Sequence, residues 1–133
     1  MKRPLLALAA ALLASCACAQ APCPAADDVT PQMLLGTWQA DLQGSWAGAI
    51  LQLQPNPDYA GSLRGTLERD GQRLQVAGDL DDDGFTLEES SDGQHIAATW
   101  LGDVVEGSCG REIRGTWTRD GETAGRAFVL RKR

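Results

Sequence analysis

An acidic segment at residues 79–90, DLDDDGFTLEES, carries the residue types that could bind a metal ion. Its start fits the pattern D-x-D-x-D-G, in which Asp79, Asp81 and Asp83 would supply calcium-ligating carboxylates and Gly84 the sharp turn. A complete EF-hand loop needs a bidentate Glu at position twelve and a helix after the loop. Position twelve is Ser90 here, and apolar and polar residues alternate from residue 85, as in a strand. The pattern excludes an EF-hand and leaves two interpretations, a non-helical calcium site or a turn between strands, of which we favour the turn.

Residues that could perform catalysis are few. His95 is the only histidine, and alternation places it on the outer face of a predicted strand, where a solvated imidazole is expected. No serine lies in a G-x-S-x-G elbow. Carboxylates for acid–base work are found only in the acidic segment, where Glu88 and Glu89 point to opposite faces of one strand. We therefore predict a protein that is not an enzyme and has no cofactor, calcium at the acidic segment being the one exception considered.

The N-terminus reads as an export signal over residues 1–19. Lys2 and Arg3 precede an apolar run at residues 5–13, which is too short to span a bilayer. The sequence L-A-S-C at residues 13–16 resembles a bacterial lipobox, which implies a lipid on Cys16 and sorting to the outer membrane. Alternatively, the A-C-A at residues 17–19 directs cleavage before Gln20. Both readings predict an exported, periplasmic protein, and the first anchors it to the membrane through a lipid.

The four cysteines divide between the signal and the mature chain. Cleavage before Gln20 leaves Cys23 and Cys109, an even pair suited to one disulfide in an oxidising compartment. Lipidation at Cys16 leaves Cys18 as an additional thiol beside the lipid. We predict a Cys23–Cys109 disulfide in either case.

The charge of the chain argues against nucleic acid as a partner. Loss of Lys2 and Arg3 with the signal takes the formal net charge from −6 to −8, whereas nucleic-acid binding requires a basic face. Basic residues do gather near the C-terminus, at positions 111, 114, 119, 126 and 131–133. We interpret them as solvent-facing strand positions and a charged tail, with contact to an anionic membrane surface as the alternative.

The remaining chain divides into a tether and one domain. Residues 20–33, rich in Ala and Pro, read as an unpacked tether, and residues 34–133 alternate with period two. Strands are predicted at residues 35–42, 49–54, 62–69, 73–78, 85–89, 95–101, 112–119 and 126–131. Asp-Gly pairs at 70–71, 83–84, 92–93 and 120–121 predict the turns between several of them. No proline follows Pro57, so the later strands are free to pair.

Eight short antiparallel strands with one apolar face predict an all-β fold, an eight-stranded up-and-down meander closed into a barrel. The segment RGTLERDG at residues 64–71 recurs as RGTWTRDG at residues 114–121. We attribute this recurrence to equivalent geometry, with duplication as the alternative. An inward glycine in each copy would let a small sheet coil tightly.

Two families of small barrels share parts of this pattern. The L-G-T-W at residues 35–38 resembles the first-strand G-x-W of lipocalins and avidins, and residues 62–67 and 98–102 are similar to strand ends of avidin-like barrels. The polar biotin-contacting residues of avidins have no counterpart here, so biotin binding is not implied. The chain also resembles periplasmic inhibitors of secreted metalloproteases, through its L-x-G-x-W-like start and the segments at 77–79, 83–87 and 92–93.

Tryptophan supplies the remaining candidate contacts. Trp38, Trp100 and Trp117 are in phase with core positions, whereas Trp46 lies in the first hairpin loop. Trp46 either contacts a ligand or partner at the barrel mouth or folds over the barrel end, and Trp38 is the second candidate contact. We predict a non-enzymatic cell-envelope binding protein for a small ligand or an envelope protein. The alternatives are a protease inhibitor that inserts residues 20–32 or a loop into an enzyme's cleft, and a structural envelope lipoprotein.

Overall fold

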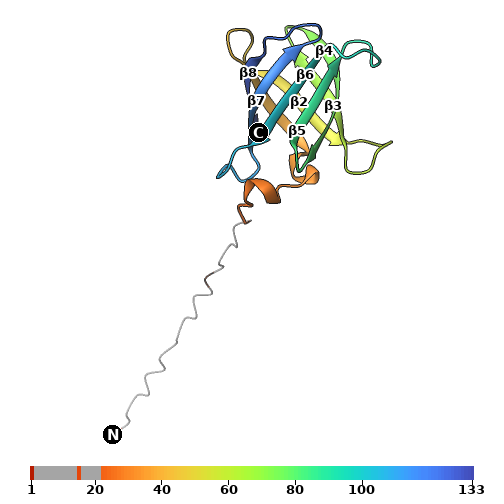
Figure 1. The fold of residues 1–133 in the computed structure, drawn as a ribbon. Helices are drawn as coiled ribbons and strands as arrows, with labels where there is room; N and C mark the ends of the chain where they lie inside the picture. The colour runs from red at the N-terminus through yellow and green to blue at the C-terminus, as the bar shows by residue number, and fades with distance from the viewer. Residues whose placement is uncertain (2–14, 16–21) are drawn as a thin grey trace.

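Eight antiparallel strands form a closed barrel in the computed structural model, which describes residues 1, 15 and 22–133 (Figure 1). The strands are β1 (Gly36–Leu42), β2 (Ala49–Pro55), β3 (Leu63–Arg69), β4 (Gln72–Asp81), β5 (Gly84–Ser90), β6 (Ala98–Val104), β7 (Glu112–Arg119) and β8 (Arg126–Lys132). Each strand pairs with the next along the chain, and β8 closes the barrel on β1. The predicted up-and-down meander barrel is confirmed.

The alternation of apolar and polar residues determines which side chains fill the barrel. The largest buried side chains include Trp38, Trp100, Phe85 and Phe128, each at most 1% exposed. They come from four different strands and are joined by leucines from β2, β3, β5 and β8. The interior is therefore a packed core, as the large inward residues predicted.

Inward glycines allow the strands to approach one another closely. A Cβ added at Gly65 would lie 1.7 Å from the Gln52 carbonyl oxygen, and one at Gly115 would lie 1.9 Å from the Leu101 carbonyl oxygen. Any side chain at these positions would collide with the backbone of the neighbouring strand. The repeated R-G-T segments thus place glycine where the barrel coils most tightly.

The sixth strand begins later than the sequence predicted. Residues 91–97 form a loop, and β6 starts at Ala98 instead of His95. The Asp92 carboxylate accepts hydrogen bonds from the backbone N–H groups of Gln94 and His95, at 2.8 Å each, so this segment turns instead of pairing. Ile96, expected to point inward, is 45% exposed.

The segment before β1 packs on the barrel, where the sequence suggested a loose tether. It contains two short 3₁₀ helices, η1 (Ala26–Asp28) and η2 (Pro31–Leu34). Val29 and Leu34 are buried, at 7% and 0% exposed. The apolar residues spaced between its prolines and alanines cover one end of the core. No helix in the described part of the chain has the length and apolar character needed to cross a bilayer.

The two ends of the barrel differ. The disulfide end carries residues 22–35 and the loops at 56–62, 82–83 and 105–111. The Trp46 end, at the top of Figure 1, carries the loops at 43–48, 70–71, 91–97 and 120–125. Residues 22–34 cover the disulfide end of the barrel. At the Trp46 end, the described residues supply only the loops that connect the strands.

Candidate functional site

The acidic segment forms the β4–β5 hairpin. Asp79 and Asp81 lie exposed on β4, and Asp83 lies in the turn that follows. Asp79 accepts a hydrogen bond from the Ser62 hydroxyl, and the Asp81 carboxylate accepts one from the Asp83 N–H at 2.8 Å. Within residues 1, 15 and 22–133, no three His, Cys, Asp or Glu side chains are grouped so that they could hold a metal ion. The structure does not bring the three predicted calcium ligands together.

His95 is exposed, as predicted, although it lies in a loop. Its Nδ1 is 2.6 Å from the Asp92 carboxylate. This hydrogen bond, together with the charge of Asp92, raises the pKa of His95 above its usual value. The backbone N–H of His95, followed by its side chain, holds the pKa of Asp92 well below its usual range. The pair stabilises the turn of the 91–97 loop.

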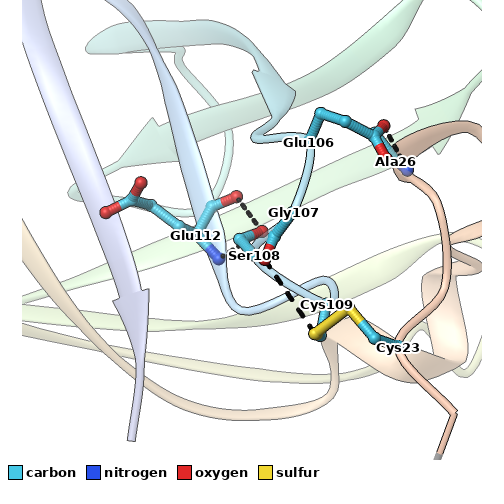
Figure 2. Close-up of a disulfide and its surroundings, with 7 residues drawn as sticks. All are labelled: Cys23, Ala26, Glu106, Gly107, Ser108, Cys109 and Glu112. Carbon is cyan, nitrogen blue, oxygen red and sulfur yellow. Dashed lines mark hydrogen bonds between the residues drawn. A yellow bond between two sulfur atoms is a disulfide. The ribbon is translucent and has the colours of Figure 1, made fainter.

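The Cys23–Cys109 disulfide is confirmed, and it fastens the N-terminal segment to the β6–β7 loop (Figure 2). The Ala26 N–H donates a hydrogen bond of 2.9 Å to the Glu106 carboxylate beside it. Cys109 has a φ of +58°, and Gly110 follows it at +75°, where Val29 packs against its backbone. The predicted lipidation site, Cys16, lies outside the described residues.

Trp38 closes the disulfide end from inside. It is 0% exposed, and its Nε1–H donates a 2.8 Å hydrogen bond to the Leu34 carbonyl oxygen. The Lys132 ammonium lies 6.0 Å from the ring centroid. In this conformation Trp38 packs and contacts no solvent, so a ligand could not reach it.

Trp46 is half-buried and folds over the opposite end of the barrel. Its ring centroid lies 5.6 Å from that of Trp100, and the Arg69 guanidinium carbon lies 5.1 Å from its ring centroid. A cleft of about 430 Å³ opens beside it, between the 43–48 loop and the β3–β4 hairpin. Its lining includes Trp46 and Arg69, with Glu68, Asp70, Gln72 and Arg73 around the rim.

A carboxylate that was not expected from the sequence lies inside this end of the barrel. Glu89 is 1% exposed and is the only polar or charged residue among the buried residues of the described chain. Both of its oxygens accept hydrogen bonds from Arg69, at 3.1 Å each, and Oε1 also accepts one from Trp117 Nε1 at 3.2 Å. Its phase with Phe85 and Leu87 was the available signal, since alternation points one of Glu88 and Glu89 inward.

Two guanidinium groups lie close to aromatic rings near Glu89. The Arg69 guanidinium carbon lies 5.1 Å from the ring centroid of Trp46 and 5.9 Å from that of Trp117. Arg119 lies 5.8 Å from the centroid of Trp117. Arg69 and Arg119 hold the same position in the two repeated segments, directly before Asp-Gly, so the sequence echo supplies both cations.

One interior polar atom at this end has no partner. Trp100 Nε1 is fully buried and makes no hydrogen bond to the described residues. Trp100 packs edge-on against Phe128 at 4.9 Å and faces the Trp46 ring at a tilt of 47°. The Trp46 end thus combines aromatic surface, a buried ion pair and a neighbouring cleft.

Comparison with protein families and with curated proteins assigns no family to this chain. No protein-family model matches the chain, and comparison with curated proteins found no match. A proposal about function therefore rests on the barrel itself and on the arrangement of residues at its Trp46 end.

Proposed function

We propose that this chain is an exported, non-enzymatic binding protein of the cell envelope, anchored by a lipid on Cys16, and that it takes a small ligand at the Trp46 end. The observation that carries the proposal is the cleft of about 430 Å³ between the 43–48 loop and the β3–β4 hairpin. It combines an aromatic side chain, Trp46, with polar groups of both charges that could orient a polar ligand. Since the barrel interior is packed, the ligand binds at the mouth, with Trp46 as its apolar contact.

An anchor at Cys16 would orient this cleft. Cys23 follows Cys16 by seven residues and is fixed to Cys109, so the lipid would lie within about 25 Å of the disulfide. The disulfide end then faces the membrane, and the Trp46 end faces the aqueous periplasm. A ligand at the cleft would come from that compartment.

The resemblance to avidins and lipocalins supports the same reading. Both families bind a ligand within a small barrel that is open at one end, and the L-G-T-W at residues 35–38 overlaps the start of β1 here. Since the interior of this barrel is packed, the resemblance supports binding only through the shared fold. The likeness is to fold and strand ends, so it supports a binding role and does not identify the ligand.

Ultrafiltration of the purified protein with a low-molecular-weight periplasmic fraction tests the proposal. Wild type should retain at least one compound, identified by mass spectrometry, and Trp46→Ala should lose it. Leu101→Ala is the matched control, because Leu101 is an exposed apolar residue, 57% exposed, on the outer wall of β6. Equal retention by wild type and Trp46→Ala would contradict the proposal. Mass spectrometry of the mature chain tests the lipid on Cys16 separately.

The alternative of a periplasmic protease inhibitor has less support. It would insert the N-terminal segment or a loop into an enzyme's cleft, yet residues 26–34 hold Val29 and Leu34 against the core. The disulfide and the Ala26–Glu106 hydrogen bond fasten the same segment. Insertion of these residues would require the segment to leave the barrel.

A further inference from the structure

Glu89 stands out as an acidic residue at an otherwise apolar position. All other inward residues of β5 are apolar, and an apolar side chain at position 89 would fill the barrel end without the cost of removing a carboxylate from water. A buried carboxylate needs a fixed partner. The question is what group the surroundings of Glu89 are built to hold.

The group held there now is a guanidinium. Arg69 meets Glu89 with two parallel hydrogen bonds of 3.1 Å, the bidentate geometry that planar guanidinium and carboxylate groups favour. Trp46 and Trp117 lie over the same guanidinium, so its charge faces two aromatic rings. Trp117 also donates from Nε1 to Glu89, which orients the carboxylate. These three residues, Trp46, Trp117 and Glu89, are called the cation cage below.

We propose that the cation cage is a binding site for a guanidinium or alkylammonium group of the ligand, and that Arg69 occupies it when no ligand is bound. This inference rests on the proposed function and supplies the chemistry of the ligand at the same site. A cationic group of the ligand displaces Arg69 and takes over its contacts with Glu89 and the two rings.

The cleft gives a ligand access to the cage. Arg69 lines the cleft and its side chain is 17% exposed, whereas Glu89 lies behind it at 1%. Arg69 is the last residue of β3, so its side chain can move into solvent without disturbing the barrel wall. The loop that carries Trp46 is bounded by Gly44 and Gly48, both with positive φ and with open space around them. Displacement thus needs motion only at the loop and the hairpin.

Chemical rescue of Arg69→Ala tests the inference without knowledge of the natural ligand. The variant leaves Glu89 without its cation, so it should melt at a lower temperature than wild type. Millimolar methylguanidinium chloride should raise its melting temperature relative to sodium chloride of equal ionic strength, because a ligand that binds only the folded state stabilises it. Wild type should show a smaller rise, because the probe must displace Arg69 before it can occupy the cage.

Two further variants show whether the cage itself binds the probe. Arg69→Ala combined with Glu89→Gln should lose the rescue, because the acceptor charge is gone. Arg73→Ala should show no rescue, since Arg73 pairs with exposed Glu68 on the rim of the same cleft. Equal responses in Arg69→Ala and in the double variant would overturn the inference. The absence of any rise in wild type at probe concentrations that saturate Arg69→Ala would also overturn it, because a cationic ligand could then not displace Arg69.

If Arg69→Ala does not fold in buffer, its refolding becomes the readout. The near-ultraviolet circular dichroism of the native barrel should return in methylguanidinium chloride and not in sodium chloride; failure to return in either overturns the inference. Ligand retention by wild type is measured separately. If wild type retains a ligand but the rescue fails, only the cation-cage inference is rejected. Rescue without retention would instead remove the proposed function alone.

Discussion

Arg69 and Arg73 flank the same hairpin and differ in what they neutralise. Arg69 pairs with Glu89, which is 1% exposed, whereas Arg73 pairs with Glu68, which is 51% exposed. When one partner of a buried ion pair is removed, the other charge remains buried and unpaired. When the remaining charge is exposed, water hydrates it instead.

We therefore expect Arg69→Ala to lower the free energy of unfolding by about 3–5 kcal/mol. Arg73→Ala should lower it by no more than about 1 kcal/mol. Urea unfolding followed by tryptophan fluorescence measures both. Similar losses in the two variants would mean that Glu89 does not depend on Arg69.

The His95–Asp92 pair predicts a pH dependence at the residue scale. The raised His95 pKa contributes stability that is complete below about pH 6.5 and is lost as pH rises through the folded-state value. The lowered Asp92 pKa contributes stability that is present above about pH 3.9 and is lost as pH falls through its folded-state value. The pair therefore stabilises its loop most between these two limits.

A proton NMR titration of the His95 imidazole checks this. Its pKa should lie above about 6.5 in wild type and fall in Asp92→Asn, which removes the negative charge and leaves only a neutral amide beside the ring. Asp27→Asn, which removes a carboxylate at the disulfide end, is the control and should leave the pKa of His95 unchanged. An unchanged pKa in Asp92→Asn would contradict the assignment.

At the scale of elements, the N-terminal segment behaves as a cap on the barrel. The segment is rich in proline and alanine and has neither strand nor helix periodicity. Both features predicted an unpacked chain. Its order comes mainly from two contacts distant in sequence, the bond to Cys109 and the Ala26–Glu106 hydrogen bond. A local hydrogen bond from Trp38 to the Leu34 carbonyl oxygen adds to them. Such contacts have no local sequence signal.

Reduction of the disulfide should therefore weaken the whole domain. The bond joins residues 86 apart, and its loss should lower the free energy of unfolding by about 2–5 kcal/mol. Chemical denaturation with and without reductant measures the loss. A Cys23→Ser/Cys109→Ser variant should start at the lower stability and not respond to reductant; a response there would show that the effect does not come from this bond.

At the scale of the whole molecule, closure of eight strands around a packed core depends on glycine where neighbouring strands come closest. A methyl group at Gly115 would lie 1.9 Å from a backbone oxygen, and the chain on both sides is held in the ladder. The barrel cannot expand at one residue without loss of pairing elsewhere.

We expect Gly115→Ala to destabilise the barrel by about 1–3 kcal/mol or more, since overpacking must be relieved by backbone shifts. Thr116→Ala, at the adjacent exposed position of β7, is the matched control and should cost less. Thermal unfolding of the two variants gives the comparison. An equal cost would show that the close approach at Gly115 is easily relieved.

The sequence alone determined the fold class, the strand order and the disulfide. Alternation with period two marks each strand because a barrel wall has one buried and one solvated face, and two cysteines in the mature domain leave one pairing. Local pattern also favoured a turn within the acidic segment, since alternation resumes at Phe85.

Only the tertiary structure decided what the Trp46 end contains. Arg69, Glu89 and Trp117 lie on β3, β5 and β7, and no local pattern reports which side chains meet at one end of a closed barrel. A charged residue at an inward position interrupts the apolar alternation, and the sequence alone does not show which partner neutralises it. The reason is physical: a buried carboxylate is tolerated only where the fold brings a cation to it, and closure of the barrel brings Arg69 to Glu89.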